Sequence, residues 1–127
     1  MSPDERFLLE VRPEAAYVAP ARIFAAELAR QSGVAEELLD DVKVAVGEAL
    51  SRALGSTPDG LTVKARRSEQ RLFFEIPQGQ PTDVRLSDTD RLTAALRLEL
   101  VTVLFDDAEA TVDEEGEPVI RFSVPVG

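Results

Sequence analysis

Glu48 and Arg52 stand four residues apart in the stretch VKVAVGEALSRAL, which covers residues 42–54. Because helical residues four apart lie one turn above each other on the same face, a helix here places both side chains together. A carboxylate such as Glu48 can serve as a general base, whereas an arginine such as Arg52 has only donors and cannot ligate a cation. A glutamate four residues before an arginine is also the favourable order for an ordinary helix ion pair, so both interpretations stay open.

The composition removes several kinds of catalytic site. The 127 residues include no cysteine and no histidine, which excludes disulfides, thiolate chemistry and the commonest metal ligand and general base. We expect any catalysis to use carboxylates, hydroxyls, Lys, Arg or the single tyrosine, Tyr17. The net charge of -10 argues against nucleic acid and anionic membrane surfaces as partners. The simplest complement to this charge is a protein partner with a basic face.

The length and hydrophobicity predict a single folded domain over residues 1–127. Forty-four per cent of the residues are hydrophobic, which is enough for a core. No apolar run reaches transmembrane length, and the N-terminal MSPDERF lacks the pattern of a signal peptide, so we expect a cytoplasmic protein. The acidic residues between 106 and 117 lack the spacing of a calcium loop, so no metal site is predicted.

Hydrophobic periodicity predicts eight elements in the order β, α, α, β, β, α, β, β. Helices are expected at about residues 20–32, 35–54 and 90–105. Strands are expected at residues 7–11, 61–66 and 71–76, with a final hairpin in 108–126 that turns at Glu115-Gly116. In the third helix the apolar stripe is expected to consist of Leu92, Ala95, Leu96, Leu100, Val103 and Leu104. Antiparallel strands beside helices indicate an α+β fold, a two-layer α/β sandwich whose mixed or antiparallel sheet is covered on one face by helices.

Three segments of the chain carry the pattern of a known family. They read PEAAYVAPARIFAAELARQSGV at residues 13–34, ELLDDVKVAVGEALSRAL at 37–54 and ALRLELVTVLFDDAEATVDEEGEPVIRFSVPV at 95–126. Together they resemble the GHKL, or histidine-kinase-like, ATPase domain, and within it the branch of small anti-sigma-factor serine kinases. The resemblance covers most of the chain and implies that family's two-layer sandwich fold.

The first nucleotide motif of this family is altered in the chain. The resemblance places Glu48 where the family uses a glutamate to orient water or accept a proton during phosphoryl transfer. It places Arg52 where the family uses an asparagine as a magnesium ligand. Because a guanidinium would repel the metal at this position, the altered motif indicates a weakened or lost magnesium site.

The two other nucleotide motifs are altered as well. The aspartate that receives the adenine amino group in the family falls at Pro77, in the sequence IPQG, although Gly79 is retained. The glycines that bring the backbone close to phosphate fall at Ala95 and Arg97, where side chains would hinder that approach. We expect this third stretch to be part of a continuous helix.

From the resemblance we expect a former nucleotide pocket formed by Glu48, Arg52, Gly79 and Arg97, with no cofactor. The alternative is ATP with magnesium, bound in a shifted pose. The two arginines at the former metal and phosphate positions have a further possible role: they bind a different anion, or they lock the pocket shut through Glu48.

The resulting prediction is a regulatory protein-binding module that resembles an anti-sigma factor, with a lost or weakened ATP site. The resemblance implies a sigma factor or an anti-sigma-factor antagonist as partner, a homodimer, and a partner surface around the first helix at Arg22 and Glu27. Arg22 is equally well explained as a plain surface charge. Whether the chain is an enzyme stays open, and one alternative is an active ATP-dependent serine/threonine kinase with Glu48 as its base. Another alternative is a structural or oligomerisation module.

Overall fold

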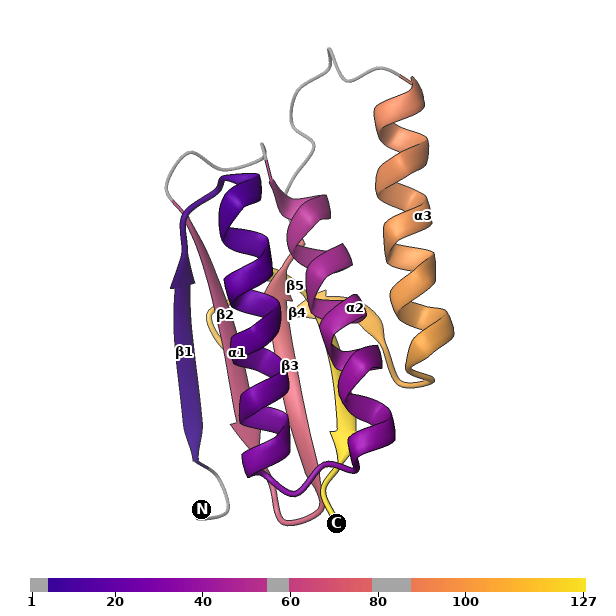
Figure 1. Cartoon of the computed structure of the whole chain (residues 1–127). Helices are drawn as coiled ribbons and strands as arrows, with labels where there is room; N and C mark the ends of the chain where they lie inside the picture. The colour runs from indigo at the N-terminus through magenta and orange to yellow at the C-terminus, as the bar shows by residue number, and fades with distance from the viewer. Residues whose placement is uncertain (1–4, 55–59, 79–87) are drawn as a thin grey trace.

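The computed structural model describes residues 5–54, 60–78 and 88–127 (Figure 1). The predicted order of elements and the α+β sandwich are confirmed, with small shifts at the element ends. A 3-10 turn, η1 (Ala15–Tyr17), precedes the first helix. The helices and strands are β1 (Arg6–Val11), α1 (Val18–Gln31), α2 (Glu36–Ala53), β2 (Leu61–Arg67), β3 (Arg71–Pro77), α3 (Asp88–Leu104), β4 (Glu109–Val112) and β5 (Pro118–Pro125).

The five strands form one sheet in the order β1-β2-β3-β5-β4, and each neighbouring pair is antiparallel. The prediction had left a mixed sheet open. Alternate residues such as Val63, Phe74 and Phe122 are buried on one face, which α1 and α2 cover (Figure 1). Because side chains alternate between the faces of a strand, the residues between these positions lie on the outer face of the sheet.

Helix α2 is the centre of the helical layer. The predicted helix is confirmed, and small residues on α1 such as Ala25 and Ala29 allow the two helices to approach closely. The contact is close at Gly47, where an added Cβ would lie 2.8 Å from Cδ of Arg22. Of α2, the side chains that are buried in the core belong to Leu39, Val42, Ala45, Val46, Ala49, Leu50 and Ala53.

Helix α3 turns a different face to the core from the one its apolar stripe predicted. Val101 is fully buried, and Phe105, just beyond the helix, stacks on Phe122 with ring centroids 4.6 Å apart. The prediction of a single apolar stripe is wrong for most of its members, because the following side chains are exposed: Leu92, Ala95, Leu96, Leu100 and Val103. None of the helices in the described part of the chain has the length and apolar character needed to cross a membrane.

The acidic turn at residues 113–117 joins β4 to β5 and folds over the outer face of the sheet. Lys64, on β2, donates hydrogen bonds to Asp113 at 3.1 Å and to Glu115 at 2.6 Å. The Asp113 carboxylate also accepts the backbone N–H groups of Glu115 and Glu117, both at 2.9 Å. Gly116 completes the predicted turn with a φ of 82°, a conformation that glycine adopts without strain. A long-range ion pair and a local turn thus share one carboxylate.

Asp113→Asn is expected to destabilise the fold by about 1 kcal/mol at neutral pH. Burial raises the pKa of the Asp113 carboxyl, but hydrogen bonds from the Glu117 amide and from Lys64 outweigh burial and hold the pKa below its usual value. A carboxyl with a lowered folded-state pKa stabilises the fold above its unfolded pKa of about 4, and this contribution is lost as the pH falls through the folded pKa. Urea unfolding at neutral pH should therefore give a lower free energy of unfolding for the variant than for the parent. In acid this difference in free energy should shrink.

The matched control is Asp40→Asn. The Asp40 side chain is 92% exposed, and its ion pair with Lys43 is long, with 3.9 Å between Oδ1 and Nζ. This control should leave the stability unchanged within error at either pH. An Asp113→Asn effect of equal size at both pH values would contradict the assigned role of the charge.

Candidate functional site

Glu48 and Arg97 form an ion pair between α2 and α3. The Glu48 Oε2 to Arg97 Nη1 distance is 2.6 Å, and the two side chains are 29% and 35% exposed. The pair is therefore partly shielded from water, which strengthens it relative to a surface pair. Glu48 makes its contact with the arginine of a different helix and not with Arg52, so the ordinary helix pair considered from the sequence is not the contact observed.

Arg52 is directed to backbone carbonyls instead. Its Nη1 donates to the carbonyl of Gln78 at 2.8 Å, and its Nε donates to the carbonyl of Ala94 in α3 at 3.3 Å. Burial lowers the pKa of the Arg52 guanidinium, yet arginine stays charged at any ordinary pH. Arg52 thus places a permanent positive charge where α2, α3 and the end of β3 meet.

The end of β3 shows how the second altered motif is built. Pro77 is paired with Val119 of β5 and carries no side-chain acceptor. Gln78 then holds the strand end to β4 and β5, because its side-chain amide donates to the carbonyls of Thr111 and Val119 at 3.3 and 3.0 Å. Gly79, the fourth residue of this predicted motif, lies outside the described residues.

The third motif lies in the middle of α3. Residues 95–98 are helical, as predicted, and the helix begins at Asp88 and ends at Leu104. Beyond the first turn of a helix the backbone N–H groups bond to carbonyls four residues earlier, so they have no free capacity for phosphate. Arg97 is the only residue of this stretch that the structure joins to Glu48.

Arg22 and Glu27 lie on α1 in two different environments. Arg22 runs across Gly47 of α2, and its Nε is buried without a hydrogen-bond partner among the described residues. Arg22 as a whole is partly buried, so its side chain packs on α2 while part of it reaches the surface. Glu27 is exposed, lies 3.5 Å from Arg30 and accepts a hydrogen bond from Gln31 at 3.3 Å.

Sequence reasoning missed one residue on this surface. Helical spacing with Phe24, Leu28 and Ala29 would give Ile23 a place in the apolar stripe of this helix, but it is 65% exposed. Ile23, Glu27 and Arg30 are spaced four and three residues apart, so they share one outward face of α1. Ile23 differs from a core residue only because no element among residues 5–54, 60–78 and 88–127 covers this face, and the local sequence holds no signal of that.

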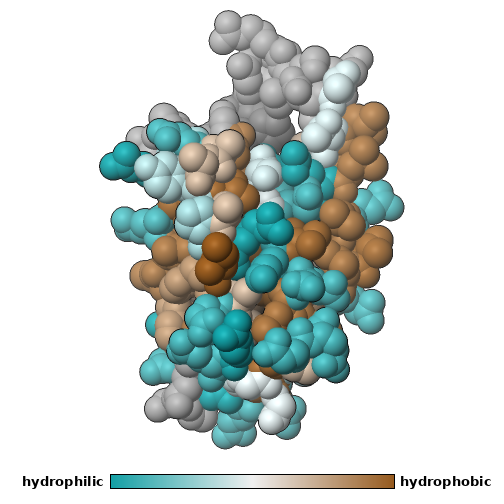
Figure 2. Space-filling view, viewed as in Figure 1, coloured by the Kyte–Doolittle hydropathy of each residue, from teal (hydrophilic) through white to brown (hydrophobic). Residues whose placement is uncertain are grey.

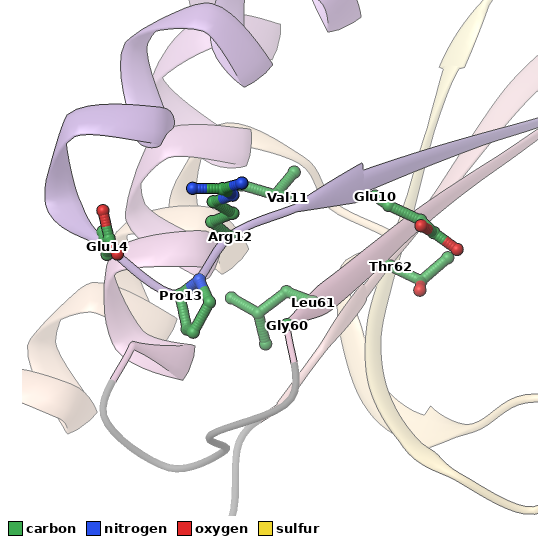
Figure 3. Close-up of a pocket in the computed structure, with 8 residues that line it drawn as sticks. All are labelled: Glu10, Val11, Arg12, Pro13, Glu14, Gly60, Leu61 and Thr62. Atoms are coloured by element: carbon green, nitrogen blue, oxygen red, sulfur yellow. The ribbon is translucent and has the colours of Figure 1, made fainter.

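A separate depression of about 610 Å³ lies at the end of β1 (Figure 3). Glu10 and Thr62, which are paired across β1 and β2, lie on one side of it. Arg12 lies 5.8 Å from the ring centroid of Tyr17, which is a cation–π distance. Among the residues that the structure describes, its walls are formed by Glu10, Val11, Arg12, Pro13, Glu14, Gly60, Leu61 and Thr62, and the described members of the predicted site are not among them.

The fold and the site together define a class of protein. A five-stranded antiparallel sheet carries its helices on one face, and a glutamate on the central helix is paired with an arginine of α3. Residues 11–121 match the family described as the histidine kinase-like ATPase domain, and the chain belongs to that family. Among curated proteins, none matches the chain closely enough to be named as a relative.

A double-mutant cycle on Glu48 and Arg97 measures how strongly the two helices are joined. We expect each single alanine variant to lower the free energy of unfolding by about 1–2 kcal/mol, since each leaves a partly buried charge without its partner. The double variant should lose less than the sum of the two single losses, which gives a coupling energy of at least about 0.5 kcal/mol in urea unfolding. Strict additivity of the two single losses would contradict a direct ion pair.

Proposed function

We propose that this domain is a regulatory module that acts by binding a partner protein. We propose further that it has lost the ATP site of its family. The observation that carries the proposal is the position of Arg52. The resemblance expects a magnesium ligand at this position, and the structure has a guanidinium bonded to the carbonyls of Gln78 and Ala94. A fixed positive charge opposes a divalent cation in the same place, and ATP normally enters such sites with magnesium.

The Glu48–Arg97 pair supports the same proposal. A glutamate that serves as general base needs a free lone pair directed at the proton it accepts. Glu48 uses one carboxylate oxygen in a charge-assisted bond of 2.6 Å to Arg97, which directs the carboxylate toward α3 and holds the arginine across the position of the phosphates. Of the two roles considered for Arg52 and Arg97, closure of the pocket through Glu48 therefore has more support than capture of another anion.

The surface proposed for the partner is the outward face of α1. Ile23 supplies an exposed apolar side chain, and Glu27 and Arg30 supply charges beside it. An apolar centre with a polar rim is the usual composition of a protein interface. Arg22 lies behind this face, because its side chain packs against Gly47 of α2.

The class of partner proposed is a sigma factor or an anti-sigma-factor antagonist, by resemblance to the anti-sigma-factor branch of the family. The net charge of -10 is consistent with this class, since a protein that contacts DNA or polymerase carries basic surfaces. Electrostatic attraction of this kind raises the association rate and weakens as salt is added.

The test is a binding measurement with the sigma factors and antagonists encoded next to the gene for this chain. We expect one of them to bind, and we expect Ile23→Glu to weaken that binding at least about tenfold, because a charge would enter the apolar centre of the interface. The matched control is Val112→Glu on β4, since Val112 is 54% exposed and lies away from α1. It should bind like the parent.

Two results would overturn the proposal. If Ile23→Glu and Val112→Glu weaken binding equally, or if neither weakens it, the α1 face is not the interface with the partner. ATP-dependent phosphorylation of the partner that is abolished by Glu48→Ala would show instead that the chain is an active kinase.

A further inference from the structure

The acidic turn at residues 113–117, which we call the strap, extends across the outer face of the sheet to the far strands. Glu114 lies 3.1 Å from Arg6 of β1, and Asp113 and Glu115 lie 3.1 and 2.6 Å from Lys64 of β2. The strap joins β4 to β5, and β3 lies between β5 and β2 in the sheet. These ion pairs therefore connect the two ends of the sheet over its outer face.

The strap has no apolar side chain to hold it in place. Its sequence is DEEGE. Val112, just before it, is 54% exposed, and Val119, just after Pro118, is the first buried residue beyond it. The helical side of the molecule differs, since Figure 2 shows hydrophobic side chains gathered along α3 at the right-hand edge of the view. Because apolar burial supplies most of the stability of a fold, the strap depends on its charges.

The strap is built as one unit. The Asp113 N–H donates to the Glu117 carbonyl at 2.9 Å, and the Gly116 N–H donates to the Asp113 carbonyl at 3.0 Å. The Asp113 carboxylate accepts two further N–H groups of the strap, those of Glu115 and Glu117. All of these bonds lie within residues 113–117, so they can persist when the ion pairs to Arg6 and Lys64 are broken.

The base of the strap is fixed to the sheet by Gln78. The side-chain amide of Gln78 donates to the carbonyls of Thr111 and Val119, and its backbone N–H donates to the Pro118 carbonyl at 3.0 Å. The carbonyl of Gln78 in turn accepts the bond from Arg52, which ties this base to the helical layer. A movement of the strap is thus confined to the positions beyond the Val112–Pro118 pair.

Two hollows, of about 730 and 230 Å³, lie on the outer face of the sheet beside the strap. Both are lined by Leu8, Lys64, Glu75 and Glu115. The bond between Lys64 and Glu115 therefore stands where the two hollows meet. Leu8 is 67% exposed and gives both hollows an apolar wall.

We propose that the strap is a lid that opens as one unit, while the rest of the fold stays intact, and so controls access to the outer face of β1 and β2. Local openings of this kind cost less than global unfolding where few apolar contacts are lost. The Arg6–Glu114 pair is exposed at both ends, by 63% and 71%, and exposed ion pairs contribute little to stability. Opening joins the two hollows into one groove beside Leu8 and Lys64. This face is opposite the helical layer, so the proposal does not rest on the α1 interface.

The first test uses the fact that Lys43 and Lys64 are the only two lysines of the chain. The protein is acetylated briefly with an amine-reactive ester, and mass spectrometry gives the ratio of Lys64 to Lys43 labelling. In the closed state the hydrogen bond to Glu115 raises the pKa of the Lys64 ammonium, which slows acylation. We expect the ratio to rise at least about threefold between about 0.02 M and about 1 M NaCl, since salt screens the ion pairs. Circular dichroism should show an unchanged fold.

The decisive test is Arg6→Gln, which breaks the pair with Glu114 and leaves both partners of Lys64 in place. Loss of a nearby positive charge would by itself raise the pKa of Lys64 and slow its labelling. If the strap moves as a unit, the same variant releases Lys64, and we expect the labelling ratio at low salt to rise at least about twofold. The matched control is Arg12→Gln, because Arg12 contacts the ring of Tyr17 and lies away from the strap. It should give the ratio of the parent.

Three results would overturn the proposal. A ratio that neither salt nor Arg6→Gln changes would show that the strap is a fixed part of the sheet. A ratio that rises with salt but stays level or falls in Arg6→Gln would show that the ion pairs act separately. An equal rise in Arg6→Gln and Arg12→Gln would show a general loosening of the fold.

Discussion

The hydrogen bonds of Arg52 hold together three parts of the chain that are distant in sequence. One guanidinium reaches the carbonyl that follows β3 and a carbonyl within α3, while its own backbone belongs to α2. Such a charge is tolerated in a partly buried place only if its donors find acceptors, and here peptide carbonyls supply them. The Glu48–Arg97 pair then lies one turn away and joins the same two helices. The position of α3 against α2 depends on these bonds, together with Val101 and the stacking of Phe105 on Phe122.

These bonds also give the proposed function its physical basis. A site that handles ATP needs a cation, an open base and backbone amides free to meet phosphate. At the matching positions this chain has an arginine bonded to carbonyls, a glutamate paired with a second arginine, and a stretch in the interior of a helix. The family scaffold would then be retained for its surfaces, of which we propose the α1 face at Ile23 as the interface with the partner.

Most of the fold could be predicted from local sequence, because the period of apolar residues changes from helical to alternating at Leu61 and back again near Leu92. The helix α2 and both hairpins followed from that period alone. It failed at α3, where apolar residues lie on two sides and only the packing of Val101 decides which side is buried. The residues of the site were foreseen, and an arginine contact with Glu48 was one of the alternatives, but the sequence could not decide between Arg52 and Arg97, since Arg97 lies 49 positions along the chain from Glu48. The bonds of Lys64 to the acidic turn were missed for the same reason.

The most direct test of the central claim is a calorimetric titration of the purified chain with ATP and ADP, with and without magnesium, followed by thermal unfolding in the same solutions. The proposed closure by Arg52 and Arg97 predicts neither heat nor stabilisation at millimolar nucleotide, since a ligand that binds only the folded state must stabilise it. Magnesium-dependent binding would contradict the claim, and it would show that the chain admits the metal and the phosphates despite the guanidinium of Arg52 and the bond between Arg97 and Glu48.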